Sequence, residues 1–171
     1  MRRVFGISGT LVAVILLAGV SAAAQQTVFV VRHAERADGG GAGMGSMGST
    51  DPELSDAGKV RAQALASALK DAGIKSIYVT EFKRTQQTAA PLAAALGIQA
   101  TVVPANDLAV LIEKLKAGSG NALVVGHSNT VPDVIKQLGV SEPVNLADTD
   151  YDHLFVVTQG PPPSLLRLHF R

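Results

Sequence analysis

The sequence predicts an α/β fold: a three-layer sandwich with a mostly parallel central sheet, helices on both faces and a C-terminal antiparallel hairpin. Two observations predict it. Short apolar runs alternate along the chain with longer segments in which apolar residues recur every three or four positions. The chain has 171 residues, of which 47% are hydrophobic, so it can bury the core of one domain and has little room for a second.

The first 24 residues have the pattern of a cleavable signal peptide. Arg2 and Arg3 precede an apolar run over residues 5–20, and alanines at 22–24 provide the small side chains that a signal peptidase recognises. The run is shorter than the ~20 apolar residues of a membrane span, which disfavours a permanent anchor. We therefore expect an exported protein, periplasmic or extracellular, that has no membrane contact after cleavage. Residues 25–171 then form the folded domain.

The domain is expected to begin with a strand, a loop and a helix. Residues 27–31 are typical of a buried strand, and the glycine-rich segment 38–50 is typical of a mobile loop. Ser55 is a suitable N-cap for a helix that ends near residue 72, just before Gly73. Its spacing predicts a buried stripe made of Val60, Ala64, Leu65, Ala68 and Leu69.

A strand and a proline-containing helix follow. Residues 77–79 form a second apolar run, and residues 83–96 have helical spacing. Gly97 is expected to end this helix, and Pro91 to kink it, because proline lacks the N–H that an interior turn needs.

The remaining elements alternate in the same way. Strands are expected over 101–103 and 122–125, with a helix over 108–116 between them. A further helix begins near Val131 and is closed by Gly139. The chain ends in two strand-like runs joined by a glycine and three prolines, which predicts an antiparallel hairpin of residues 154–158 and 165–170.

The composition excludes several kinds of site. The chain has no cysteine, so disulfides, thiolate metal sites and cysteine nucleophiles are absent. A formal net charge of +1 and an aromatic content of 4% are not typical of a nucleic-acid surface, which needs clustered cations and stacking side chains. Cleavage after residue 24 would leave 13 basic against 14 acidic residues, so a bound anion must be held by local arginines.

Basic and imidazole side chains follow three of the predicted strands. Arg32 and His33 come directly after the first strand, Arg84 lies five residues after the second, and His127 follows Gly126 after the fourth. The carboxyl ends of parallel strands meet at one edge of a sheet, so these side chains are expected to converge there. Because the planar guanidinium matches phosphate in two-point geometry, the sequence predicts a phosphoryl-binding pocket.

These segments resemble the signatures of the histidine phosphatase superfamily, in its phosphoglycerate mutase-like and phosphohistidine phosphatase-like branch. The agreement in order and spacing covers roughly residues 28–138 and rests on four blocks: 31–35 (VRHAE), 54–58 (LSDAG), 83–89 (KRTQQTA) and 124–128 (VVGHS). The resemblance implies a hydrolase that acts on phosphomonoesters or phosphoamidates, without a metal or other cofactor.

The resemblance also implies residue roles. His33 would attack phosphorus and form a covalent phosphohistidine, while Arg32, Arg84 and His127 would neutralise the phosphoryl oxygens. His33 must be neutral to attack, and its cationic neighbours are expected to lower its pKa. Arg36 matches another phosphate-binding arginine of related acid phosphatases, with a surface charge as the alternative.

Two further residues complete the expected substrate-binding set. Glu35 would hydrogen-bond the pocket arginines or face solvent. Ser128 follows His127 directly, at the position where some relatives carry an aspartate that serves as the general acid. That arrangement is therefore absent from this chain.

The general acid is expected elsewhere. Asp107 is one candidate, with an N-cap of the helix that follows it as the alternative. Glu81, three residues ahead of Arg84, is the second candidate. If neither residue serves, the enzyme would favour substrates with good leaving groups, including phosphoamidates such as phosphohistidine.

The expected substrates are phosphorylated small molecules or phosphoproteins, because the 42 residues between Arg84 and His127 are too few for a large cap over the pocket. Two other functions remain open. One is a non-catalytic domain that binds phosphoanions or has a regulatory role. The other is a divalent-metal site built from His33, His127 and a carboxylate such as Glu35. His153 and His169 are interpreted as structural.

Overall fold

The computed structural model describes residues 25–39 and 51–171, so the predicted signal peptide and residues 40–50 of the predicted loop lie outside the described residues. The elements are β1 (Thr27–Arg32), α1 (Asp56–Leu69), β2 (Ile74–Val79), α2 (Lys83–Leu96), β3 (Thr101–Val102), α3 (Leu108–Ala117), β4 (Asn121–Gly126), α4 (Thr130–Gln137), β5 (His153–Thr158) and β6 (Ser164–His169). None of the helices in these two ranges is long and apolar enough to cross a membrane.

One six-stranded sheet forms the middle layer, with the order β3-β2-β4-β1-β5-β6. The first four strands of that order are parallel, and β5 pairs antiparallel with both β1 and β6. The predicted mostly parallel sheet with a C-terminal hairpin is thus confirmed. The register pairs Arg32 of β1 with Gly126 of β4. The next residue of each strand is a histidine, so His33 and His127 leave the sheet side by side.

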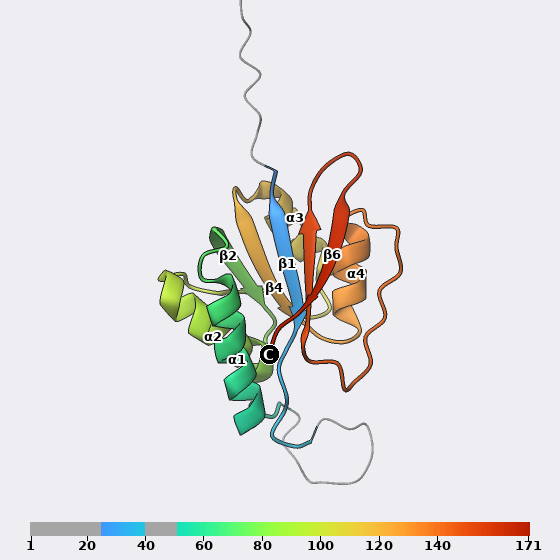
Figure 1. Ribbon diagram of the computed structural model, residues 1–171. Helices are drawn as coiled ribbons and strands as arrows, with labels where there is room; N and C mark the ends of the chain where they lie inside the picture. Colours follow the sequence, from blue (N-terminus) through green and yellow to red (C-terminus); the bar gives the residue numbers. More distant parts are fainter. Residues whose placement is uncertain (1–24, 40–50) are drawn as a thin grey trace, which may run out of the picture.

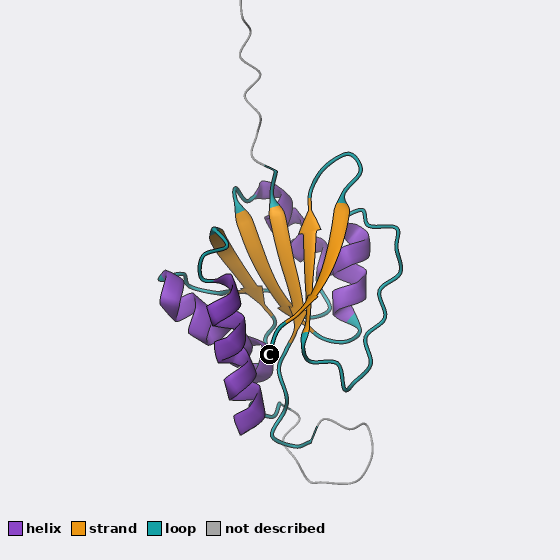
Figure 2. Cartoon of the chain, viewed as in Figure 1, coloured by secondary structure: helices purple, strands orange, loops and turns teal. Residues whose placement is uncertain are grey.

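Helices cover both faces of the sheet (Figures 1 and 2). Helices α1 and α2 pack on one face over a buried cluster that includes Val31, Leu65, Leu69, Leu92 and Leu123. Helices α3 and α4 pack on the other over a cluster that includes Leu115, Val124, Val131, Ile135 and Phe155. These layers hold the carboxyl ends of β1, β2 and β4 at one edge, which is the lower edge in Figure 1.

Helix α1 is rotated relative to the prediction. Ser55 is its N-cap and accepts a hydrogen bond from the Gly58 N–H, as expected. The predicted stripe is wrong at Val60, which is 71% exposed, and at Ala68, which is also exposed; the buried residues are Gly58, Ala62, Leu65, Ala66 and Leu69. A Cβ at Gly58 would overlap the Glu35 carbonyl oxygen, so this glycine allows the helix to lie against the chain after β1.

The other helices follow the prediction closely. Helix α2 runs through Pro91 and ends at Gly97, whose φ of 65° is the left-handed conformation that glycine adopts without strain. Gly139, with a φ of 92°, follows the C-cap of α4. Strand β2 begins at Ile74, three residues earlier than predicted. Exposed Lys75 follows buried Ile74, so the start of the strand is not part of the continuous apolar run on which the prediction rested.

Candidate active site

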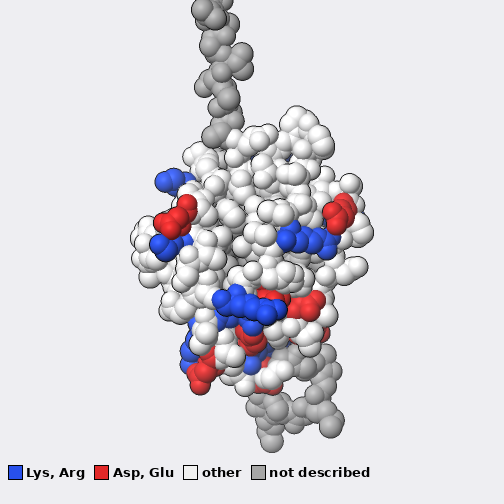
Figure 3. Space-filling model, viewed as in Figure 1, with Lys and Arg blue, Asp and Glu red and all other residues white. Residues whose placement is uncertain are grey.

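A cleft of about 590 Å³ lies at the carboxyl edge of the parallel strands. Charged side chains gather at this edge, whereas the opposite end of the same face carries few (Figure 3). The lining brings together six predicted residues, Arg32, His33, Arg36, Arg84, His127 and Ser128. Their neighbours in the lining are Phe82, Ala105, Asn106, Asn129, Thr130 and Asp148.

His33 is held in one tautomer by the backbone carbonyl of the next residue, Ala34. Its side chain is buried, and its Nδ1 lies 2.8 Å from the carbonyl oxygen of Ala34. A carbonyl only accepts, so Nδ1 carries the proton and Nε2 keeps its lone pair. The backbone N–H of His33 donates to the Gly126 carbonyl at 2.9 Å, which fixes the residue relative to β4. His33 therefore presents a positioned nitrogen nucleophile.

His127 faces His33 and has the opposite tautomer. The two ring centroids are 5.3 Å apart. The Nε2 of His127 lies 3.0 Å from the Thr80 hydroxyl oxygen, which is 2.9 Å from the hydroxyl of Thr85, and Thr85 donates to the Phe82 carbonyl at 2.8 Å. Because that carbonyl only accepts, the chain of hydrogen bonds runs one way and the proton lies on Nε2 of His127. Its Nδ1 accepts from the Arg84 guanidinium at 3.4 Å.

Both imidazoles are neutral at neutral pH. Burial lowers the pKa of His33 to about 3, and the charges of Arg32, His127 and Arg84 act in the same direction, against the hydrogen bond to Ala34. Burial, with the charge of Arg84, lowers the pKa of His127 to about 4. Cations thus surround two uncharged rings, and the expected depression at His33 is found.

Arg32 is fixed by the loop between α4 and β5. The Arg32 side chain is 5% exposed. Its guanidinium donates to the Ala147 carbonyl at 3.0 Å and lies 4.2 Å from the centroid of the Tyr151 ring. One of its nitrogens is 3.8 Å from an Asp148 carboxylate oxygen. Sequence reasoning missed this loop, since it has no recognisable motif and lies 115 or more residues from Arg32 along the chain.

Arg84 and Arg36 complete the cationic lining. Arg84 lies over the Phe82 ring at 4.2 Å and 3.6 Å from an Asp51 carboxylate oxygen, and burial together with the charge of Arg36 lowers its pKa. Arg36 hydrogen-bonds to the Asp38 carboxylate. In the described ranges 25–39 and 51–171, the Nε atoms of Arg32, Arg36 and Arg84 are buried without a hydrogen-bond acceptor. An oxyanion would supply the acceptors that these donors lack.

Of the two further residues predicted to bind substrate, Glu35 lies outside the cleft and Ser128 lines it. The Glu35 carboxylate accepts from Nε and Nη2 of Arg61 at 2.6 to 2.9 Å and does not line the cleft. Its hydrogen bonds go to Arg61 on α1 and not to Arg32, Arg36 or Arg84, the arginines that line the cleft. Ser128 does line the cleft, where its hydroxyl donates to the Asp148 carboxylate at 3.0 Å.

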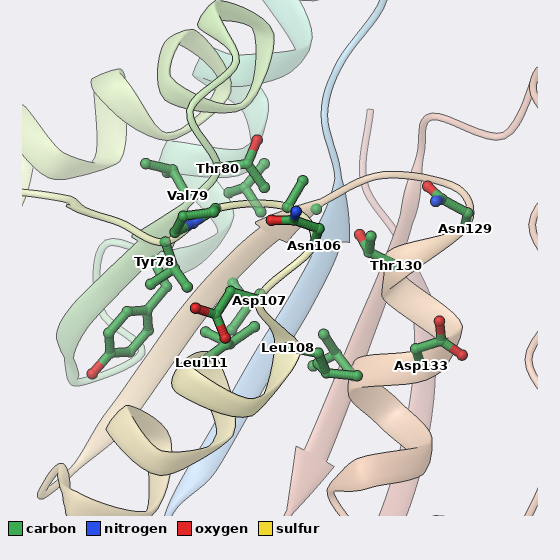
Figure 4. Close-up of a pocket in the computed structure, with 17 residues that line it drawn as sticks. Tyr78, Val79, Thr80, Asn106, Asp107, Leu108, Leu111, Asn129, Thr130 and Asp133 are labelled. Carbon is green, nitrogen blue, oxygen red and sulfur yellow. The ribbon is translucent and has the colours of Figure 1, made fainter.

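Neither expected general acid lines the cleft. Asp107 is the N-cap of α3 and accepts from the Val110 N–H at 3.2 Å. It lines an adjoining cavity of about 230 Å³ between α3 and α4 (Figure 4), which shares Ala105, Asn106, Asn129 and Thr130 with the cleft. The Glu81 carboxylate accepts from the Ala105 N–H at 2.8 Å. Among the described residues that line the cleft, the carboxylate belongs to Asp148, which sequence reasoning missed.

The arrangement does not suit the alternative metal site at His33 and His127. Glu35, the carboxylate proposed to complete it, is engaged by Arg61. The Nδ1 atoms of both histidines have hydrogen-bond partners, and guanidinium groups adjoin both rings. Bringing a divalent cation among them would be electrostatically unfavourable.

Comparison with known proteins supports the resemblance seen in the sequence. The family model of the histidine phosphatase superfamily (branch 1) matches residues 28–109, a range that contains three of the four sequence blocks. None of the curated proteins gives a significant match.

Solved structures share the fold at low sequence identity. The protein histidine phosphatase SixA complexed with tungstate is 18% identical with a TM-score of 0.66, and the match covers 84% of this chain and 96% of that one. A mycobacterial glucosyl-3-phosphoglycerate phosphatase is 14% identical with a TM-score of 0.60, covering 78% and 90%. The structure of that phosphatase in complex with inorganic phosphate is 15% identical with a TM-score of 0.61, and the match covers 83% of this chain and 95% of that one.

Proposed function

Since the chain matches the histidine phosphatase superfamily over residues 28–109, we propose that it is a phosphatase that hydrolyses phosphomonoesters or phosphoamidates through a phosphohistidine on His33. One observation carries this proposal. A neutral imidazole with a free Nε2 lies in a cleft with three arginines whose buried Nε donors lack acceptors in the described part of the chain. This set combines a nucleophile with an anion site.

The proposed first step is an attack by the His33 Nε2 lone pair on phosphorus. The bond from phosphorus to the leaving oxygen or nitrogen breaks as the new nitrogen–phosphorus bond forms. Arg32 and Arg84 stabilise the charge on the transferring group, a mainly electrostatic contribution. A phosphate dianion beside Nδ1 of His127 favours a proton there, which turns this ring from an acceptor into a donor.

We assign proton transfer to Asp148 in place of Asp107 and Glu81. Its carboxylate lines the cleft, lies 3.8 Å from Arg32 and accepts from Ser128, the residue next to His127. In its protonated form it would donate to the leaving atom. The resulting carboxylate would then take a proton from the water that attacks phosphohistidine, releasing phosphate and restoring His33.

The openness of the cleft supports small phosphorylated molecules and phosphoprotein segments as substrates. Asp148, which lines it, is exposed to solvent, so a substrate can reach this side chain from outside. We further propose that residues 1–24 direct export of the chain. Cell fractionation with mass measurement of the product would test this. A periplasmic or secreted product that lacks these residues is expected, and an intact cytoplasmic product would contradict export.

The defining experiment measures p-nitrophenyl phosphate hydrolysis by the wild type and by His33→Ala. We expect turnover by the wild type that survives chelator, is inhibited by vanadate and is lost in His33→Ala. A phosphate-binding measurement on the wild type separates the alternatives. Binding without any wild-type turnover would instead support a non-catalytic phosphoanion-binding domain, which the same three arginines would also permit.

A further inference from the structure

We propose that Asp152, His153 and His169 form a binding site for a divalent transition-metal ion of the Zn²⁺ class. The three residues each offer one ligand atom, and these atoms lie within 4.8 Å of one another. The site is distinct from the phosphate cleft, whose histidines are His33 and His127. It does not depend on the proposed phosphatase activity.

The β-hairpin preorganises the two imidazoles. His153 of β5 and His169 of β6 are directly paired in the antiparallel register, so their side chains project from the same face of the sheet. Their ring centroids are 4.4 Å apart. His153 is further fixed by stacking on Phe155, at 5.7 Å and an interplanar angle of 11°. Rigid strands therefore hold both nitrogen ligands, which favours metal binding over a chance encounter of flexible side chains.

Asp152 supplies a negative oxygen ligand. Its Oδ2 is 3.2 Å from Nδ1 of His169. Its backbone carbonyl accepts from the Phe170 N–H at 2.9 Å, which fastens the residue to the end of β6. Two imidazoles and one carboxylate suit Zn²⁺, with water in the remaining position.

An unpaired polar atom supports the same conclusion. The Nδ1 of His153 is buried and has no hydrogen-bond partner among the described residues. A buried nitrogen without a partner is unfavourable, and a metal ion would relieve that cost. Ligand atoms around tetrahedral zinc are about 3.4 Å apart, given bonds of about 2.1 Å. Rotation of the His169 ring, which is 54% exposed, can close the remaining gap.

The charged side chains around the site predict how substitutions near it should change its affinity for zinc. Arg171 Nε lies 3.8 Å from the Asp152 carboxylate, and the Arg171 side chain is 88% exposed. Arg61 also acts on the Asp152 charge from α1, although its hydrogen bonds go to Glu35 and to the Phe170 carbonyl. On the other side, the Asp150 carboxylate is 4.0 Å from Nε2 of His153 and favours a cation. Zinc would displace Arg171, so removing that side chain should tighten binding.

The experiment is titration calorimetry of the purified, untagged full chain with ZnCl₂. We expect one ion per chain for the wild type, binding at least about 10-fold weaker for His169→Ala and His153→Ala, and tighter binding for Arg171→Ala. His33→Ala and His127→Ala are matched controls that remove the other two histidines, and they should bind zinc as the wild type does. Far-UV circular dichroism checks that each variant is folded.

Ring nitrogen signals in ¹⁵N NMR spectra identify the ligands without substitution. Zinc should shift the His153 and His169 signals and leave those of His33 and His127 in place. The proposal is overturned if the wild type binds no zinc, if binding survives in folded His169→Ala, or if the shifts occur at His33 and His127.

Discussion

At the scale of single residues, hydrogen-bond direction sets the chemistry of the two cleft histidines. A carbonyl accepting from Nδ1 leaves Nε2 of His33 free, and the Thr80–Thr85 chain places the proton of His127 on the opposite nitrogen. Both rings are buried beside guanidinium groups, which disfavours the imidazolium form. The site therefore holds a neutral nucleophile within a cationic pocket.

This burial predicts loss of stability in acid. The unfolded chain takes up protons on these imidazoles below the ordinary pKa of 6.5, whereas the folded chain does not until about pH 4 for His127 and about pH 3 for His33. The free energy of unfolding should therefore have its full value above pH 6.5 and fall as the pH decreases toward those values, by up to about 1.4 kcal/mol per pH unit for each ring. Urea unfolding at several pH values measures this slope. His33→Asn should reduce it, and an unchanged slope would contradict a neutral buried His33.

The assignment of proton transfer to Asp148 predicts dependence on the leaving group. Asp148→Asn should lower kcat/KM about 100-fold for alkyl phosphates, whose leaving group needs a proton, and much less for p-nitrophenyl phosphate. Asp107→Asn and Glu81→Gln are matched controls and should behave as the wild type with both substrates. Selective loss in either control would return the role to that residue.

At the scale of elements, the first turn of α1 positions the chain that leaves β1. The Ser55 N–H donates to the Glu35 carbonyl at 2.9 Å, and Gly58 lies against the same carbonyl. Thr88 of α2 accepts from the Ala34 N–H at 2.9 Å. The segment that carries His33 and Arg36 is thus held in place by the start of α1 and by α2.

Gly58→Ala should therefore be strongly unfavourable. Its Cβ would meet backbone atoms, which cannot rotate away, so we expect a loss of about 1–3 kcal/mol in the free energy of unfolding together with reduced turnover. Lys59→Ala, in the same turn and exposed, is the control and should be nearly neutral. Chemical denaturation of both variants measures the difference. Equal stability would show that α1 can move away from Glu35.

At the scale of the whole molecule, an ion pair joins distant parts of the chain beside the cleft. Arg61 of α1 binds Glu35 after β1 and donates to the Phe170 carbonyl at 3.2 Å, near the C-terminus. Burial by itself raises the pKa of Glu35, but the hydrogen bonds and charge of Arg61 outweigh it and lower the pKa. The C-terminus lies beside α1 in Figure 1, in agreement with this contact.

Glu35→Gln should lower the free energy of unfolding by about 1–2 kcal/mol at neutral pH while turnover persists. Because the pKa of Glu35 is lower in the folded chain than its ordinary value of 4.5, Glu35 stabilises the folded state above pH 4.5, and this contribution is lost as the pH falls below that value. The stability difference between Glu35→Gln and wild type should therefore shrink in acid, as measured by urea unfolding. Loss of turnover in a stable variant would instead indicate a role in the cleft.

Much of the fold followed from local pattern. Apolar periodicity gave the order and approximate bounds of the strands and helices, and capping chemistry located the starts at Ser55 and Asp107. The convergence of Arg32, His33, Arg84 and His127 also followed, since parallel strands present their carboxyl ends at one edge. These properties depend on sequence neighbours and on one general rule of sheet topology.

Only the tertiary structure decided which groups meet across long separations. The Glu35–Arg61 pair, the rotation of α1 about Gly58, the Arg32–loop contacts and the placement of Asp148 in the cleft each join segments 20 or more residues apart. The cross-strand pair His153–His169 depends in the same way on the hairpin register. Hydrophobic spacing specifies which face of an element is buried. It does not specify which polar side chain the opposing element presents there, because that depends on packing.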